Sequence, residues 1–119
     1  MRTSWETLWS FNTAHFRVTW DIAPDDDCDT SFDETGETAE KIASGEWFCF
    51  VSRVLVTLDG REVGCDYLGG SIYAEPREFR DHIGARGKYG SYFTDMVGEA
   101  ISEARKNVAA MQSIKVRAA

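Results

Sequence analysis

The strongest hydrophobic pattern in the chain covers residues 46–75, where two runs rich in β-branched and aromatic residues flank Asp59-Gly60. This pair favours a two-residue type I′ turn, because Gly adopts positive φ freely and Asp tolerates it. The pattern therefore predicts a β-hairpin. With Leu58 opposite Arg61, the pairs farther from the turn are Val56 with Val63, Arg53 with Asp66, and Val51 with Leu68. Two apolar pairs and one pair of opposite charges support this register.

The first strand of the hairpin is apolar on both faces. Phe48, Phe50, Val54, Val56 and Leu58 share one face, and Trp47, Val51 and Leu55 share the other. Such a strand is typical of the centre of a sheet, so we expect it to be covered on both sides near its start. In the second strand, Gly69-Gly70 predicts a β-bulge or a close approach of another backbone.

Residues 10–22 alternate between apolar and polar side chains, which predicts a half-buried strand at one flank of the sheet. Phe16, Val18, Trp20 and Ile22 form its apolar side. Pro24 is expected to end the strand, because proline cannot donate to a central ladder. Residues 5–9 fit either a short helix or an extension of this strand.

Two short helices are predicted. The first covers residues 36–44, with Thr35 as a possible N-cap and Gly45 just past the end. Ala39, Ile42 and Ala43 would form its thin apolar face. The second begins at Glu75-Pro76, since proline suits the first helical position, and Phe79 and Ile83 would anchor it.

One long helix is predicted from Ser91 to about Met111. Its apolar stripe, at spacings of three and four, consists of Phe93, Met96, Val97, Ala100, Ile101, Ala104, Val108 and Met111. The residues from Ser113 lack this period, so we expect them to fray or to lie along an edge. The elements together predict a single α+β domain over residues 1–119, with an antiparallel sheet of three to four strands and this C-terminal helix packed on one face.

The charge of the chain is unevenly distributed. Its net charge is −7, and residues 1–46 carry 11 acids against three bases, while the remainder is close to neutral. Direct binding of nucleic acid is therefore not expected, because such binding needs a basic surface that displaces counterions. A basic protein surface is the favoured partner.

The three cysteines, Cys28, Cys49 and Cys65, have no CxxC spacing, and we expect small buried hydrophobic side chains or free thiols in a reducing compartment. A metal site would need four ligands from five scattered Cys and His residues, so neither a metal nor a cofactor is predicted. No run of 18 apolar residues and no basic-then-apolar start is present, which predicts a cytoplasmic protein without a membrane segment.

Eight acids and no base lie between residues 25 and 40. They are Asp25, Asp26, Asp27, Asp29, Asp33, Glu34, Glu37 and Glu40. A calcium loop that starts at Asp29 would place Glu34 where the sharp turn needs glycine, so the run does not match that motif. Two interpretations remain: a solvated acidic face, or a partner-binding surface whose mutual repulsion a cationic partner would relieve.

The glycine-spaced segment 84–91 offers an alternative site, that of a small anion- or nucleotide-binding domain or enzyme. Arg86 and Lys88 there could bind a phosphate or carboxylate ahead of the long helix, although the segment does not match a phosphate-binding P-loop. His15 and His82 have no recognisable nucleophile or acid pair beside them, so no catalytic residue is assigned and no enzymatic activity is expected. The hairpin edge or the long helix could also pair with a second copy, and the sequence leaves the oligomeric state open.

The acidic segment Asp25–Asp29 with Asp33-Glu34, and the stretches 67–73 and 90–96, resemble small proteins encoded by phages and mobile elements. In size, charge and element order the chain resembles anti-CRISPR and other anti-defence inhibitors. This resemblance implies a non-enzymatic inhibitor that binds a nucleic-acid-handling host defence complex, often at a channel lined by Lys and Arg. Such inhibitors differ in fold, so the resemblance assigns no site residue.

Overall fold

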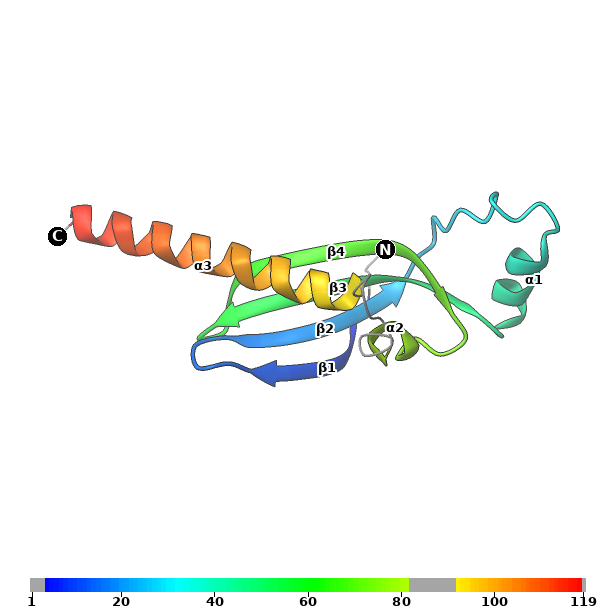
Figure 1. Ribbon diagram of the computed structural model, residues 1–119, viewed down its shortest axis with the longest axis horizontal. Coiled ribbons are helices and arrows are strands. Elements are labelled where there is room, and N and C mark those ends of the chain that lie inside the picture. The colour runs from blue at the N-terminus through cyan, green and yellow to red at the C-terminus, as the bar shows by residue number, and fades with distance from the viewer. Residues whose placement is uncertain (1–3, 82–91, 119) are drawn as a thin grey trace.

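The computed structural model describes residues 4–81 and 92–118. Its centre is a four-stranded antiparallel sheet with the strand order β1-β2-β3-β4. The strands are β1 (Glu6–Asn12), β2 (Arg17–Pro24), β3 (Phe48–Leu58) and β4 (Arg61–Tyr73), and the helices are α1 (Glu37–Ser44), α2 (Glu78–Asp81) and α3 (Tyr92–Ala118). The predicted α+β fold, a sheet with a long C-terminal helix on one face, is confirmed (Figure 1).

The β3–β4 hairpin forms as predicted around Asp59 and Gly60, which both have positive φ. Its register, however, shifts by one residue between Val56 and Thr57, so Val56 faces Gly64 and Arg53 faces Tyr67. The pairs predicted beyond the turn are therefore wrong, because a bulge adds one residue to β4. A second shift lies at Gly69-Gly70, where a bulge was expected, and it brings Ser71 opposite Phe50.

The strand predicted over residues 10–22 is in fact a β-hairpin. Strand β1 ends at Asn12 and β2 starts at Arg17, and the two pair antiparallel. In the turn between them, Thr13 Oγ1 accepts a hydrogen bond from the Phe16 N–H at 3.0 Å. The alternation seemed continuous because both strands of this hairpin point apolar side chains to the same face, and Trp9 lies opposite Trp20.

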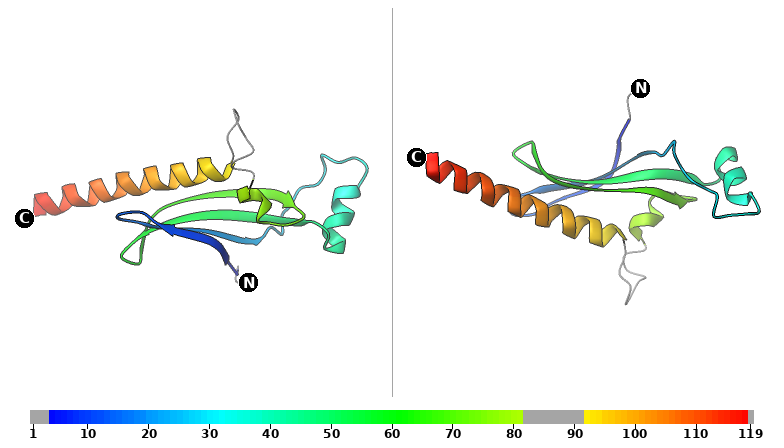
Figure 2. Two further views of the ribbon diagram at one scale, coloured as in Figure 1. Left: turned by 60° about the horizontal axis from the view of Figure 1, so that its bottom comes forward. Right: turned by 90° about the horizontal axis from the view of Figure 1, so that it is seen from above.

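The core lies between the sheet and helices α2 and α3, which cover the same face of the sheet (Figure 2). Its fully buried members include Val18, Trp20, Phe50, Val54, Val56, Ala100 and Ala104. The Trp20 indole N–H donates to the buried Ser52 hydroxyl at 3.1 Å, which satisfies both polar groups. Helix α3 passes so close to β4 that a Cβ at Gly64 would lie 2.3 Å from the Ala100 carbonyl oxygen.

Helix α3 continues to Ala118, so the prediction of a frayed segment from Ser113 is wrong. Its C-terminal part projects past the end of the sheet (Figure 1), and Met111 and Ile114 are exposed there. Ser91, the predicted first residue of the helix, and Ile83, a predicted anchor of the second helix, lie outside the described residues, whereas Phe79 is buried as expected. Within the described part of the chain, no helix combines the length and apolar character needed to cross a membrane.

The second face of the sheet carries a polar cluster. Asp21, only 2% exposed, accepts hydrogen bonds from the Arg53 guanidinium at 2.7 and 3.0 Å and from the Thr7 hydroxyl at 2.5 Å. The Trp5 ring stacks over Arg53, 4.2 Å from its central carbon, and lies beside the exposed Tyr67. Side chains of β3 on this face are only half-buried, so the expectation that the strand is covered on both sides is wrong.

Candidate functional site

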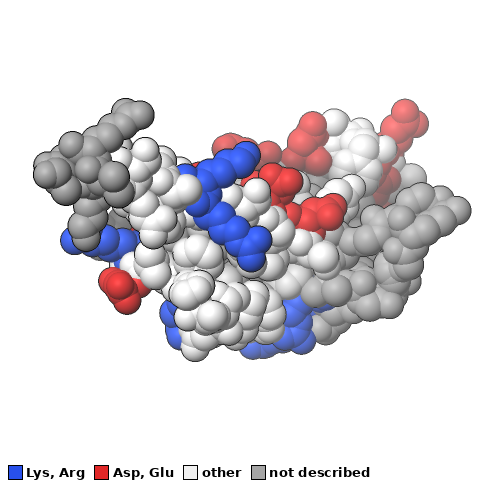
Figure 3. All heavy atoms as spheres, turned by 60° about the vertical axis from the view of Figure 1, so that its left-hand side comes forward, with Lys and Arg blue, Asp and Glu red and all other residues white. Residues whose placement is uncertain are grey.

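The acidic run forms an arm at one end of the sheet. We use the name acidic arm for residues 25–46, which link β2 to β3, contain α1, and carry nine acids against the single base Lys41. Figure 1 shows the arm beyond the ends of the strands, opposite the end where α3 projects. Viewed from the α3 end, acidic side chains are visible at the far, faded end of the molecule, and Lys and Arg side chains lie nearer together with further acidic ones (Figure 3). The arm therefore concentrates negative charge at one end.

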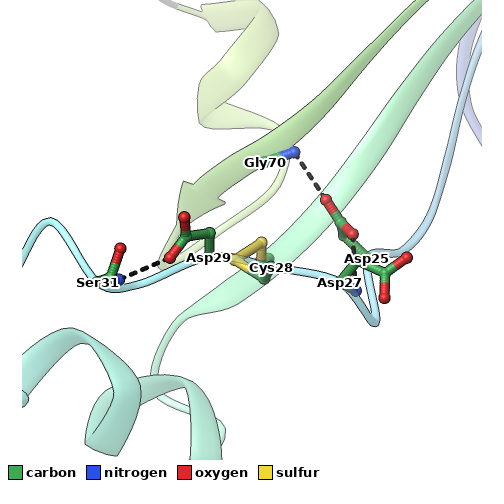
Figure 4. The surroundings of a disulfide bond; sticks show 7 residues. Asp25, Asp27, Cys28, Asp29, Ser31 and Gly70 are labelled. Carbon is green, nitrogen blue, oxygen red and sulfur yellow. Dashed lines mark hydrogen bonds between the residues drawn. A yellow bond between two sulfur atoms is a disulfide. The ribbon is translucent and has the colours of Figure 1, made fainter.

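A disulfide between Cys28 and Cys49 ties the arm to the start of β3. The expectation of three free thiols is wrong for this pair, and only Cys65 is free. Sequence gave no local signal of the pairing, because the two cysteines are 21 residues apart. The cross-link closes all of the arm after Asp27 into a loop, and Figure 4 shows it between Asp25 and Asp29.

Two of the eight predicted acids fix the base of the arm (Figure 4). The Asp25 carboxylate accepts hydrogen bonds from the backbone N–H groups of Gly70, at 2.8 Å, and Asp27, at 3.1 Å. Gly70 has a φ of 72°, which brings its N–H to the arm at the second bulge of β4. The Asp29 carboxylate accepts from the Ser31 N–H at 2.9 Å, and hydrogen bonds from the Ser31 hydroxyl and N–H lower the pKa of Asp29.

A third acid, Asp33, holds the start of α1. Its carboxylate accepts hydrogen bonds from the hydroxyl and N–H of Thr35 and from those of Thr38, at 2.6 to 3.0 Å. These bonds, the two hydroxyls first, hold the pKa of Asp33 well below its ordinary value. The N-cap residue is Gly36, so Thr35, the predicted cap, lies one position too early, although its Oγ1 accepts from the Glu37 N–H at 3.2 Å.

Helix α1 buries almost none of its predicted apolar face. Ala39 and Ala43 are exposed and Ile42 is half-buried, whereas the buried residue is the polar Thr38. The helix ends at Gly45 as predicted, in the left-handed conformation that closes the last turn. Its position therefore depends on the hydrogen bonds and the disulfide of the arm more than on apolar packing.

The remaining carboxylates of the run are available to a partner. Asp26, Asp27, Glu34 and Glu40 are exposed, and their carboxylates make no hydrogen bond or ion pair with the described residues. Glu37 lies 3.7 Å from the Lys41 ammonium. The predicted set thus divides into three acids that shape the arm, one that is paired with Lys41, and four that face solvent.

The structure also places two aromatic rings at the arm: Trp47, which was predicted to lie on the hairpin strand, and Phe32, to which no role was assigned. Trp47 precedes β3 rather than lying on it, and its backbone N–H donates to the Lys41 carbonyl at 3.1 Å. The Lys41 ammonium lies 4.8 Å from the centre of the Trp47 ring and 3.6 Å from the Glu46 carboxylate. Phe32, in the arm itself, is 69% exposed. The signal available in the sequence was a phenylalanine between acidic residues, Asp29 and Asp33.

The alternative site falls outside the described residues. Arg86, Lys88 and the rest of the 84–91 segment lie there, as does His82, so the structure neither supports nor opposes anion binding by them. His15 is exposed in the turn between β1 and β2. Among residues 4–81 and 92–118, no group of three or more His, Cys, Asp or Glu side chains is placed to hold a metal ion.

Comparison of the chain with protein-family models, curated proteins and solved structures finds no match. No relative's activity or partner can therefore be transferred to it.

Proposed function

We propose that this protein is a non-enzymatic binding protein whose acidic arm docks on a basic protein surface. The observation that carries the proposal is that the carboxylates of the arm fall into two groups with different contacts. Asp25, Asp29 and Asp33 hold the loop and helix in place, and four others stay exposed and unpaired with any described residue. The exposed carboxylates thus belong to a cross-linked, hydrogen-bonded arm.

Ordering of the arm before binding favours this function. A disordered acidic segment would give up conformational entropy when it docked, and that cost would reduce its affinity. Here a disulfide and several backbone-to-carboxylate hydrogen bonds have already restricted the chain. The concentrated negative field would also steer the arm toward a cationic partner and raise the association rate.

The partner class we propose is a nucleic-acid-handling complex of a host defence system, as the anti-CRISPR resemblance implies. Surfaces that bind nucleic acid are lined by Lys and Arg, and carboxylates can occupy the positions that phosphates take. The same negative charge disfavours direct binding of nucleic acid to this chain. Inhibition would then follow from competition for the basic channel.

The cytosol of the host cell is the location that this role implies. A phage-type inhibitor of such a complex acts in the host cytosol, where thiols are normally kept reduced. The Cys28–Cys49 disulfide favours an oxidising environment instead. Alkylation of free thiols at the moment of cell lysis, followed by mass spectrometry, distinguishes the two: an alkylated Cys28 supports the cytosol, and a protected one opposes it.

The proposal is tested by capture of host proteins on the purified protein, followed by elution with increasing salt and by competition with DNA or RNA. The discriminating variant carries Asp26→Lys, Asp27→Lys and Glu34→Lys, which remove exposed carboxylates of the arm without touching its internal hydrogen-bonding groups. The matched control carries Glu62→Lys, Glu99→Lys and Glu103→Lys, exposed acids on β4 and α3.

Both triple variants change the net charge equally, so only position differs between them. We expect the wild type and the control to capture a basic nucleic-acid-binding complex, and the arm variant to lose it. Equal capture by both variants, or capture that salt and nucleic acid leave unchanged, would contradict the proposal.

A further inference from the structure

An open hollow lies between the acidic arm and the sheet. Its volume is about 510 Å³, and it is lined by Phe32 and Thr38 of the arm, by Trp47, and by Ile72, Tyr73, Ala74 and Glu78 from the end of β4 and the start of α2. Phe32 is the most exposed of these rings. The walls are mainly aromatic and aliphatic, and the surrounding arm carries eight more acids than bases. An apolar hollow bordered by carboxylates favours a ligand that combines an apolar stem with a positive end.

One wall of the hollow, Trp47, already contacts a cation of the protein itself, the side chain of Lys41. The Lys41 ammonium lies 4.8 Å from the centre of the Trp47 ring, within the range of a cation–π contact. Two carboxylates, of Glu37 and Glu46, lie 3.7 and 3.6 Å from the same ammonium. Trp47, a wall of the hollow, therefore stands in an environment that attracts positive charge.

We propose that the hollow between Phe32 and Trp47 binds an arginine side chain of the basic partner, an inference that rests on the proposed function of the arm. The aliphatic stem of arginine would lie against Ile72 and Ala74, and its planar guanidinium would stack on the exposed Phe32 ring. The Glu78 carboxylate at the wall supplies a hydrogen-bond acceptor for the guanidinium.

Arginine fits this hollow better than lysine for two reasons. The guanidinium is planar and stacks on aromatic faces, and it is hydrated more weakly than an ammonium, so less free energy is needed to place it against apolar walls. A cation that enters an aromatic hollow gives the interface a central anchor, around which the exposed carboxylates of the arm form a charged rim. The arm would then recognise arginine side chains as well as net positive charge.

The test uses two synthetic glycine–serine peptides, one with two arginines and one with two lysines at the same positions. Their binding to the ¹⁵N-labelled full chain is followed by NMR at low salt, through the Trp47 indole N–H and the backbone amides of Ile72 and Ala74. We expect the arginine peptide to shift these signals and to bind about fivefold more tightly than the lysine peptide. Phe32→Ala should weaken the binding of the arginine peptide by about fivefold.

Two further variants make the test specific. Ile114→Ala is the matched control, because Ile114 is 65% exposed, close to the 69% of Phe32, but lies at the opposite end of the molecule. It should leave the binding of the arginine peptide unchanged. Lys41→Met keeps an apolar stem but removes the competing ammonium beside Trp47, so it should tighten that binding.

The outcomes separate this inference from the proposed function. One outcome is that both peptides bind equally, shift only the amide signals of the exposed acidic residues, and bind Phe32→Ala as tightly as the wild type. This outcome excludes the arginine site but leaves charge-driven docking of the arm in place. If neither peptide shifts the Trp47, Ile72 or Ala74 signals, the inference also fails, and capture of the basic complex still tests the arm independently. If Ile114→Ala weakens binding as much as Phe32→Ala does, the effect is not local and the site is excluded.

Discussion

Removal of the Cys28–Cys49 disulfide is predicted to destabilise the protein and to loosen the acidic arm selectively. The cross-link joins residues 21 apart, and nearly all of the arm lies between them. Helix α1 buries little, so few other contacts would hold the arm in place once the bond is broken. The perturbation is Cys28→Ala, and reduction of the wild type is its chemical equivalent.

The magnitude follows from chain entropy. In the loop-closure model, a cross-link that closes a loop of about 22 residues lowers the entropy of the unfolded chain by about 11 cal/mol/K, which is about 3.4 kcal/mol at 25 °C. At about 4 °C per kcal/mol for a domain of this size, the melting temperature should fall by about 13 °C. Hydrogen bonds such as that from Gly70 to Asp25 remain available in the variant, so the arm should loosen without unfolding of the sheet.

The assay is urea unfolding of the wild type, Cys28→Ala and Cys65→Ala, each with and without reductant. We expect the reductant to lower the free energy of unfolding of the wild type and of Cys65→Ala by about 3 kcal/mol, and to leave Cys28→Ala unchanged. Cys65→Ala is the matched control, because Cys65 is the free cysteine among the described residues. Hydrogen exchange of the oxidised and reduced wild type should show faster exchange in residues 26–47 than in β2 and β3.

Two results would refute this reasoning. An unfolding midpoint of the wild type that reductant does not move would show that the cross-link adds no stability. Recovery of Cys28 as an alkylated free thiol from non-reduced, air-oxidised protein would show that the pair does not form.

Three further predictions concern the sheet, its packing and the arm. Gly64→Ala should destabilise the folded protein by about 3 kcal/mol, because the added methyl group would meet the backbone of α3. Gly98→Ala adds a methyl group in open space on α3 and should stabilise the protein by about 1 kcal/mol. Thermal unfolding of the two variants checks the contrast. Arg53→Ala should lower the free energy of unfolding by about 3 kcal/mol, because it leaves the buried Asp21 carboxylate without its cation. The double variant Asp21→Asn with Arg53→Met should lower it by less. Denaturant unfolding measures both variants, and equal losses of stability would contradict the pairing. The hydrogen bonds to Asp33 depress its pKa in the folded state, so its contribution to stability is present above its ordinary pKa of 3.8 and is lost as pH falls through the folded-state value. An NMR titration of its carboxyl carbon should therefore give a midpoint below 3.8, and a midpoint at or above 3.8 would exclude the hydrogen bonds from Thr35 and Thr38.

Elements with strong local signals were predictable from the sequence. The Asp59-Gly60 turn and the stripe of α3 depend on turn chemistry and on helical period, which are local properties. The register of the hairpin was not predictable, because the bulge lies where Gly64 packs against Ala100 and Ala104 of α3, a contact between residues far apart in the sequence. The β1–β2 turn was missed because residues 13–16 contain neither glycine nor proline.

The acidic run was visible in the sequence, but the roles of its members were not. In the sequence, the eight acids differ little from one another. In the structure, the carboxylates of Asp25 and Asp33 accept hydrogen bonds from backbone N–H groups, whereas others are exposed. The role of Asp25 depends on Gly70, which is distant in sequence, whereas that of Asp33 depends on Thr35 and Thr38 in the following turn. The hollow at Phe32 likewise combines residues from the arm, β4 and α2, which no periodicity connects.

The most direct test of the acidic-arm account is the salt dependence of affinity for the captured basic complex. The dissociation constants of the wild type, the arm variant and the β4–α3 control are measured at 50 and 200 mM salt. We expect salt to lower the affinities of the wild type and of the control by the same factor, since exposed charges are screened over about 10 Å near 0.1 M ionic strength. The arm variant should bind far more weakly at low salt and lose most of its salt dependence. An arm variant that keeps the wild-type affinity and the wild-type salt dependence would contradict the account.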